Sequence, residues 1–199
     1  MEARPFTREV EIVLLLASPI SRYEGRPSDG PLSAVGPEVR ESIEIRAGLG
    51  VVGDRYFAKP AHVHASVTLM ASEVLDAVAD DLGIARGLDA SATRRNILLR
   101  GVDVDSMRGT TFSLDTGGGE IVFLANRPAN PCAWMDVTLA PGAHKALRGR
   151  GGMRCEPLTS GVLRLGPATL RSSMELPPEA SGTPAPGAHA TSAEAPGPR

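Results

Sequence analysis

The chain has two cysteines, and only Cys132 lies in a segment whose composition favours a reactive thiol. The segment reads Asn126-Arg127-Pro128-Ala129-Asn130-Pro131-Cys132-Ala133-Trp134-Met135. Its prolines and asparagines, placed directly after an apolar run, predict a rigid loop, and loops held by a scaffold often carry reactive groups. The nearby cation of Arg127 would favour the thiolate, which is the form that binds metal or attacks sulfur. The alternative interpretation is a small buried side chain, because unpaired cysteine is among the most buried residue types.

The second thiol, Cys155, has none of these features. It lies inside a predicted strand, Met153-Arg154-Cys155-Glu156, so we expect it to pack in the core. The two cysteines are far apart and form no Cys-x-x-Cys motif, so no disulfide framework can be read from them. This cysteine usage indicates a reducing compartment, which argues against a disulfide between Cys132 and Cys155.

Two cations and an amide lead into a predicted strand at Thr93-Arg94-Arg95-Asn96-Ile97. Since side chains alternate along a strand, we expect Arg94 and Asn96 on one face and Arg95 on the other. Arginine and asparagine on one face can hold a phosphate or a pterin ring through forked hydrogen bonds. A solvated edge or a structural salt bridge is the alternative reading of the same residues.

Two further groups of polar residues have a mainly structural interpretation. Gly53-Asp54-Arg55-Tyr56 predicts a tight turn in which Asp54 bonds its own backbone and Arg55 pairs with that carboxylate. His62 and His64 would share one face of a strand, as metal ligands can, but no third ligand follows at a suitable spacing. Hydrogen-bonded or exposed histidines are therefore the favoured reading.

The charge balance excludes several classes of partner. There are 21 basic and 23 acidic residues, a net charge of −2, and no run of like charges. We therefore expect no surface dedicated to nucleic acid or to an anionic membrane, and partners that are small molecules or proteins. The longest apolar run near the start, residues 12–17, is too short to span a bilayer or to act as a secretory signal. These features predict a soluble, cytoplasmic protein.

Short apolar runs separated by glycine and polar turns predict a strand-rich domain. Ser72 as N-cap and Gly83 as terminator frame one helix, whose apolar residues recur at helical spacing from Val74 to Leu82. A second short helix is expected over residues 143–148, and a long loop over 18–37. The predicted strands cover residues 10–17, 39–45, 67–70, 95–100, 111–114, 121–125, 153–158 and 162–165.

Many short strands with one or two helices indicate a mostly-β fold closed into a barrel, because closure removes exposed strand edges. We expect this single domain to cover residues 8–171. Residues 172–199 are rich in proline, alanine and glycine and contain no aromatic residue. Such a segment buries too little apolar surface to offset the entropy of ordering it, so it is predicted to be a disordered tail.

The order of several short motifs resembles that of MOSC domains, named for the C-terminal domain of molybdenum cofactor sulfurase. The resemblance covers about residues 10–170 and therefore nearly all of the predicted domain. Its motifs are Gly50-Val51-Val52-Gly53-Asp54-Arg55, Val67-Thr68-Leu69-Met70, Arg94-Arg95-Asn96-Ile97, Arg100-Gly101-Val102-Asp103, Pro131-Cys132, Arg150-Gly151-Gly152-Met153-Arg154 and Val162-Leu163-Arg164-Leu165-Gly166.

The resemblance implies a closed MOSC-type β-barrel and a role in handling the molybdenum cofactor, molybdopterin. In members such as the mitochondrial amidoxime-reducing component a cysteine binds the cofactor's molybdenum, and Cys132 matches that position. Arg94 and Asn96 match an Arg-x-Asn element that helps to hold the pterin or phosphate in such relatives. Arg127 and Arg55 are further candidates for binding the anionic part of the cofactor.

The departures from the family pattern imply that partners contribute to function. The chain lacks the N-terminal β-barrel domain of the reductase members and the aminotransferase-like domain whose lysine holds pyridoxal phosphate in the sulfurase. Tyr56 stands where many relatives carry histidine. We expect a protein that binds molybdenum cofactor or carries sulfur for it through Cys132. The alternatives are a molybdenum-dependent reductase of N-hydroxylated small molecules, served by an electron-transfer protein, and a cofactor-free persulfide carrier, served by a pyridoxal-phosphate-dependent cysteine desulfurase.

Overall fold

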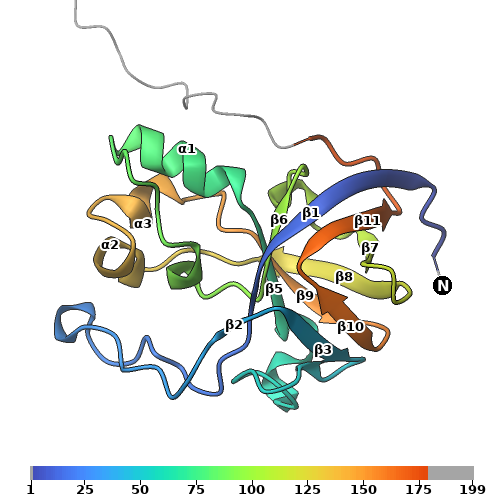
Figure 1. Cartoon of the computed structure of the whole chain (residues 1–199), viewed down its shortest axis with the longest axis horizontal. Helices are drawn as coiled ribbons and strands as arrows, with labels where there is room; N and C mark the ends of the chain where they lie inside the picture. The colour runs from blue at the N-terminus through green and yellow to red at the C-terminus, as the bar shows by residue number, and fades with distance from the viewer. Residues whose placement is uncertain (1, 179–199) are drawn as a thin grey trace, which may run out of the picture.

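The computed structural model describes residues 2–178, so most of the predicted tail lies outside the described residues. Strands predominate, as expected, and the helices gather on one side of the molecule (Figure 1). The strands are β1 (Phe6–Leu16), β2 (Val39–Arg40), β3 (Ser42–Arg46), β4 (Gly50–Val51), β5 (Val67–Ala71), β6 (Ile97–Arg100), β7 (Thr111–Asp115), β8 (Ile121–Pro128), β9 (Met153–Pro157), β10 (Gly161–Arg164) and β11 (Gly166–Ser172). The α-helices are α1 (Glu73–Asp81), α2 (Trp134–Thr138) and α3 (Ala143–Ala146), and 3₁₀ turns cover Pro27–Asp29, Pro60–Ala65, Ala90–Thr93 and Asp105–Met107.

The main sheet closes on itself into a barrel of seven strands. Its strands follow the order β11-β7-β8-β9-β5-β6-β1, and β1 completes the ring by pairing with β11. The long strand β1 makes this possible because its first half pairs with β11 and its second half with β6. β2 extends the sheet beyond β1, and β10, β3 and β4 form a separate small sheet. The predicted closed, mostly-β fold is confirmed.

One crossover interrupts the antiparallel pattern. β5 and β6 pair in parallel, and α1 lies in the connection between them, as parallel neighbours require. α1 buries the apolar face that the sequence predicted, including Val74 and Val78, and Gly83 follows the helix with a positive φ of 67°. Ser72 stands at the N-cap, but its hydroxyl bonds the Glu73 carboxylate and caps no backbone amide.

The barrel interior is a continuous apolar core. Every residue of β5 is buried, and the stacked rings of Phe112 and Phe123 join β7 to β8 with their centroids 5.2 Å apart. Burying each such side chain contributes about 1.5–3 kcal/mol. The core continues past the last strand, since Leu176 is only 4% exposed and its carbonyl accepts a hydrogen bond from Arg8.

Several predicted boundaries differ from the structure: β1 begins at Phe6, residues 39–45 form two strands, and β8 extends to Pro128. β6 begins at Ile97, because Arg94 adopts a left-handed conformation with φ 60° and the chain becomes extended only after it. β11 was absent from the predicted strands, because its sequence Gly-Pro-Ala-Thr-Leu-Arg-Ser has no β-branched apolar run. Its pairing with β1 and β7 on either side makes it a strand.

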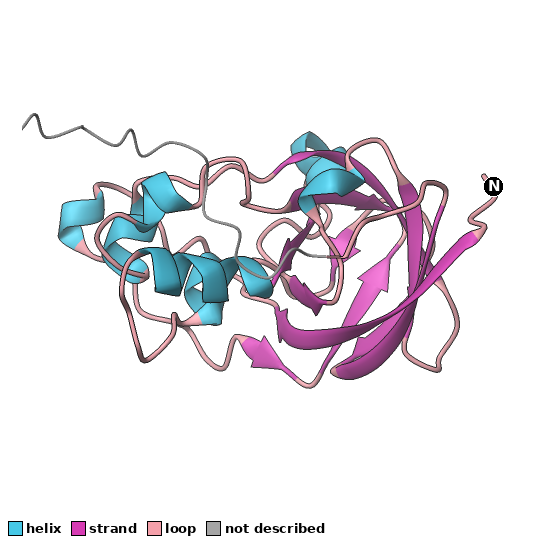
Figure 2. Ribbon diagram, turned by 90° about the horizontal axis from the view of Figure 1, so that it is seen from above, coloured by secondary structure: helices cyan, strands magenta, loops and turns pink. Residues whose placement is uncertain are grey.

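Figure 2, seen from above, shows most helices gathered at one end and the strands at the other. Within residues 2–178, none of the helices has the length and apolar character needed to cross a bilayer.

Candidate functional site

The ends of five barrel strands meet at one mouth of the barrel. The ladders pair Leu15 of β1 with Ile97 of β6, and Pro128 of β8 with Met153 of β9. Leu69 of β5 pairs with both Ile97 and Met153. Segments next to these strands line one cavity, although they are far apart in the sequence.

A cavity of about 220 Å³ lies between these segments. Its walls come from the loop after β1, the turn after β4, the entry to β6, the loop after β8 with the start of α2, and strand β9. The lining residues are Ser21, Arg22, Tyr23, Arg55, Tyr56, Thr93, Arg94, Arg95, Asn130, Pro131, Cys132, Trp134, Met135 and Arg154. The structure thus brings together Cys132, Arg94 and Arg55 of the predicted site residues.

The thiol of Cys132 is exposed and lines this cavity. Arg95 holds the loop of Cys132 in place. Its guanidinium donates hydrogen bonds to the carbonyls of Ala129 at 2.6 Å and Gly151 at 2.9 Å. The Ala129 N–H in turn donates to the Gly152 carbonyl at 2.7 Å. These bonds fix the backbone at Ala129, three residues before the thiol. The loop of Cys132 is therefore anchored, in agreement with the rigid loop that its prolines and asparagines predicted.

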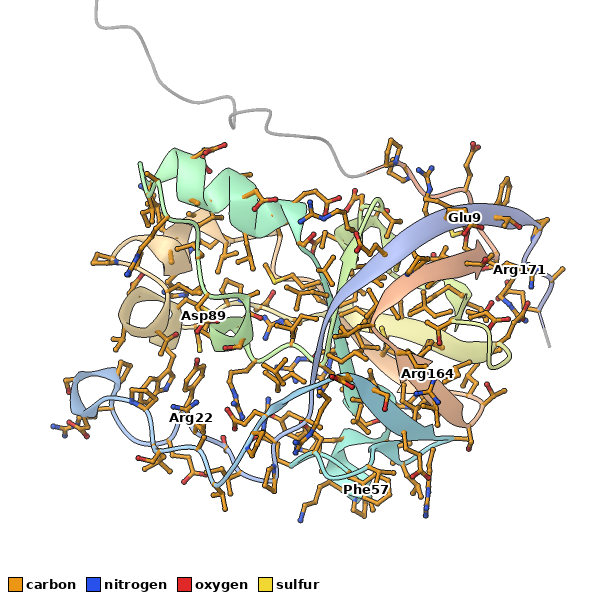
Figure 3. All side chains as sticks on the ribbon, in the orientation of Figure 1. Glu9, Arg22, Phe57, Asp89, Arg164 and Arg171 are labelled. Atoms are coloured by element: carbon orange, nitrogen blue, oxygen red, sulfur yellow. The ribbon has the colours of Figure 1, made fainter. Side chains whose placement is uncertain are left out.

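Five arginines surround the thiol, from four separate segments. Arg94 is 5% exposed and donates to the Glu38 carboxylate at 2.6 Å, and Arg22 donates to the same carboxylate at 3.1 Å. In Figure 3, Arg22 lies between the loop after β1 and the helical side of the molecule. Partial burial would raise the pKa of Glu38, but hydrogen bonds from Arg94, Ser18 and Arg22 outweigh it and lower the pKa to about 2.

Arg95 and Arg154 carry positive charge that no carboxylate pairs within residues 2–178. Arg95 donates only to backbone carbonyls. Burial first, and then the neighbouring charge of Arg154, lower the pKa of Arg95 to about 10, whereas the negative charge of a Cys132 thiolate acts to raise it. Arg95 is therefore still protonated at neutral pH.

Arg55 leaves a donor unused at the wall of the cavity. Its guanidinium lies over the Tyr56 ring at 4.6 Å, and its Nη1 is 3.5 Å from the Asp54 carboxylate. That Nη1 is buried and has no hydrogen-bond partner in the described part of the chain. At 3.5 Å this contact is an ion pair and not a hydrogen bond, so the Asp54 carboxylate already compensates part of the Arg55 charge.

An aromatic pair forms the wall next to α2. Tyr23 and Trp134 stack with centroids 5.2 Å apart and planes 11° apart, and Arg94 lies 5.8 Å from the Tyr23 ring centroid. The Tyr23 hydroxyl donates to the Ala92 carbonyl at 2.5 Å, and burial raises the pKa of Tyr23. Tyr23 is therefore a neutral, fixed surface that gives the mouth of the cavity a defined shape.

Asn96 does not line the cavity, in contrast to the expectation that it shares a face with Arg94. Its amide is 1% exposed, donates to the Leu16 carbonyl and the Asp54 carboxylate at 3.1 Å each, and accepts from Thr68. The alternation of a strand does not apply here, because the left-handed Arg94 precedes the strand. Arg95 consequently turns toward the cavity and Asn96 into the interior.

Arg127 also lies outside the cavity wall. It is exposed at the end of β8, directly opposite Arg154 in the β8–β9 ladder, and a register shift between Ala125 and Arg127 separates it from the regular strand. Its cross-strand neighbour Arg154 lines the cavity instead.

The remaining candidates have structural surroundings. Cys155 is buried in β9, as expected, and burial raises the pKa of its thiol far above the usual range. His62 packs against Tyr56 and His64 bonds Glu156 at 2.5 Å, both from a 3₁₀ turn. No group of three or more metal-ligating His, Cys, Asp or Glu residues occurs among residues 2–178.

The family model of the MOSC domain matches residues 53–168. The chain belongs to the MOSC domain family. Among solved structures, this MOSC domain is similar to the YUAD protein from Bacillus subtilis, with a TM-score of 0.64 and 14% identity over 85% of this chain and 99% of that chain. It is also similar to YiiM from Geobacillus stearothermophilus, with a TM-score of 0.51 and 16% identity over 81% of this chain and 74% of that one. Identities this low show a shared fold. No curated protein matches the sequence.

The site of this MOSC domain suits an anionic group with a soft metal or sulfur at one end. A thiolate is a preferred ligand of soft centres, and guanidinium forks match phosphate and other oxyanions. A second cavity of about 330 Å³ shares Ser21, Arg55 and Tyr56 with the first and continues over the apolar walls of Pro60 and Ala61. The two cavities together offer a polar part beside Cys132 and an apolar part for a flat ring.

Sequence reasoning did not assign several lining residues to the MOSC domain site, among them Arg22, Tyr23, Arg95, Trp134 and Arg154. Arg154 closes the Arg-Gly-Gly-Met-Arg motif that contributed to the family resemblance, so a signal for it was present. Arg22, Tyr23 and Trp134 stand in loops or at a short helix, where no periodicity says which way a side chain points.

Proposed function

We propose that this MOSC domain binds molybdenum cofactor at the mouth of its barrel, with Cys132 as ligand of the metal or carrier of sulfur for it. The observation that carries the proposal is an exposed thiol in the same cavity as five arginines, of which Arg95 and Arg154 have no carboxylate partner within residues 2–178. Membership of a family associated with this cofactor supports the same conclusion.

The residues of the site have distinct roles in this proposal. Cys132 presents its sulfur from a loop fixed by Arg95, and Arg55, Arg94 and Arg154 bind the anionic part. When bound, the cofactor supplies a molybdenum centre able to exchange sulfur, oxygen and electrons. Tyr23 and Trp134 restrict water on one side of the thiol, since their stacked rings form a continuous apolar surface. Electron delivery for a reductase reaction would come from a partner protein, because the sequence contains no flavin or iron–sulfur motif.

Elemental analysis tests the binding claim most directly. Protein purified from a host that makes the cofactor is expected to contain stoichiometric molybdenum and the fluorescence of oxidised pterin. Cys132→Ala is expected to lose most of the molybdenum, and Cys155→Ala, which removes the buried thiol, to keep it. Wild-type protein without molybdenum or pterin, even after incubation with cofactor, would refute the proposal.

A persulfide carrier that works without bound cofactor is the second candidate function. Its supporting observation is that Cys132 is the exposed thiol of the pair and lines the same cavity as five arginines. After incubation with a cysteine desulfurase and cysteine, the Cys132 peptide is expected to gain the mass of one sulfur atom.

A further inference from the structure

The cavity beside Cys132 holds more positive charge than the protein itself pairs. Arg22 and Arg94 share the Glu38 carboxylate, and Arg55 lies beside Asp54. Arg95 and Arg154 have no carboxylate partner within residues 2–178, as described above. Two guanidinium charges therefore remain for a ligand that binds next to an exposed thiol.

We propose that this cavity binds a small sulfur oxyanion of the thiosulfate class, and that Cys132 takes the transferable sulfur from it. The inference rests on the proposed role of Cys132 as a sulfur carrier, and it adds the chemical class of the donor. The part of the site next to Cys132 is a cavity of about 220 Å³. A compact tetrahedral anion fits this space and matches the forked donors of arginine.

The sulfur transfer is balanced without another reactant. The Cys132 thiolate attacks the outer, sulfane sulfur of thiosulfate and forms a new S–S bond with it. The S–S bond of thiosulfate breaks, and its electron pair leaves with the sulfite product. Cys132 becomes a persulfide anion, so the total charge is the same before and after.

The main barrier to this step is electrostatic repulsion between a thiolate and a dianion. The positive charges of the arginines reduce this repulsion. Arg95 and Arg154 are placed to bind the oxygen atoms, where negative charge increases as sulfite departs. Arg55, whose Nη1 lies 3.5 Å from the Asp54 carboxylate, adds a third guanidinium to the cavity wall. Arg127, opposite Arg154 on β8 but outside the cavity, has no part in the step.

The test uses the reduced full-length protein and sodium thiosulfate under anaerobic conditions. Sulfite release and the mass of one added sulfur on the Cys132 peptide are the two readouts. Wild type and Cys155→Ala are expected to give both, and Cys132→Ser neither. Arg154→Ala is expected to raise the half-saturating thiosulfate concentration about tenfold, because it loses a charge-assisted hydrogen bond. Arg127→Ala removes the same charge outside the cavity and is expected to change it less than about twofold.

Sodium polysulfide, which donates sulfur but has no oxygen atoms, separates the possible failures. If polysulfide sulfurates Cys132 while thiosulfate yields neither sulfite nor added mass, the donor class is wrong and the carrier role stands. If neither compound sulfurates Cys132, the carrier role fails together with this inference, and molybdenum binding is still decided by elemental analysis. Equal half-saturation for wild type and Arg154→Ala would show that the anion does not bind in this cavity.

Discussion

Two polar regions of the barrel lie within a few residues of each other and differ in how their hydrogen bonds are satisfied. In the buried polar cluster of Asp54, Thr68 and Asn96, each side chain bonds protein groups from other segments. In the cavity around Cys132, donors exceed acceptors and the thiol is exposed. A polar cluster whose hydrogen bonds are all satisfied within the protein stabilises the fold, whereas unpaired donors beside a reactive group indicate a ligand-binding site.

Adjacent residues illustrate the contrast. Asn96 completes the buried polar cluster, and its neighbour Arg95 supports the loop of Cys132. Substitutions in the two regions should therefore have opposite consequences for stability and for binding.

The largest expected effect on stability comes from a substitution in the loop whose Gly151 carbonyl accepts a hydrogen bond from Arg95. In Gly152→Ala the new Cβ would lie 2.0 Å from the Leu69 carbonyl oxygen, at a φ of 86°, so we expect a loss of at least about 3 kcal/mol of unfolding free energy. Gly149→Ala is the matched control, since it has a φ of 80° and open space, and should cost about 1 kcal/mol. Urea unfolding measures both, and equal losses would contradict the close approach.

Asn96→Ala should be the next most damaging change, because it leaves buried partners in three segments without their hydrogen bonds. We expect a loss of about 2–3 kcal/mol in the free energy of unfolding. Asn126→Ala, which removes one exposed bond to the His64 carbonyl, should cost less than about 1 kcal/mol. If Asn96→Ala unfolded like wild type but lost molybdenum, Asn96 would belong to the ligand site after all.

The pH dependence of stability tests the contact between Asp105 and the loop at Gly152. Burial raises the pKa of Asp105 to about 6, despite a 2.9 Å hydrogen bond from the Gly152 N–H. The pKa of Asp105 is higher in the folded state than in the unfolded state. The contribution of Asp105 to the free energy of unfolding is therefore fully present below pH about 4 and is lost as the pH rises through about 6.

In Asp105→Asn the fall between these pH values should be smaller than in wild type, by on the order of 1 kcal/mol after allowing for partial solvent exposure. Parallel pH profiles of the two proteins in chemical denaturation would contradict the assignment. Glu38 gives the opposite trend at lower pH, since its pKa is lowered to about 2, so the difference between the two proteins isolates Asp105.

The smallest expected effect on stability, that of Arg154→Ala, tests whether the cavity residues are dispensable for the fold. Arg154→Ala removes a charge that repels Arg95 and makes no ion pair in the described residues, so the unliganded protein should gain a few tenths of a kcal/mol or stay unchanged. Thermal unfolding in low salt measures this. A loss above about 1 kcal/mol would mean that Arg154 stabilises the fold and is not reserved for a ligand.

Much of the fold was encoded locally. The apolar runs placed most of the strands and the long helix, because side-chain periodicity reflects which face is buried. The turn at Asp54 formed as its residue types predicted, with the Tyr56 N–H donating to the carboxylate at 3.0 Å. The loop of Cys132 and the burial of Cys155 followed from composition in the same way.

Tertiary structure decided the rest. β11 is a strand because β1 and β7 lie on either side of it, and its own residues carry no such signal. Whether Arg95 or Asn96 faces the cavity depended on one left-handed residue before the strand. The five arginines come from four segments between residues 22 and 154, and barrel closure brings them to one mouth. Local sequence determined the backbone conformation of most elements, because apolar periodicity and turn residues act over short distances, but the direction of a loop side chain and the pairing of an edge segment depend on what packs against them.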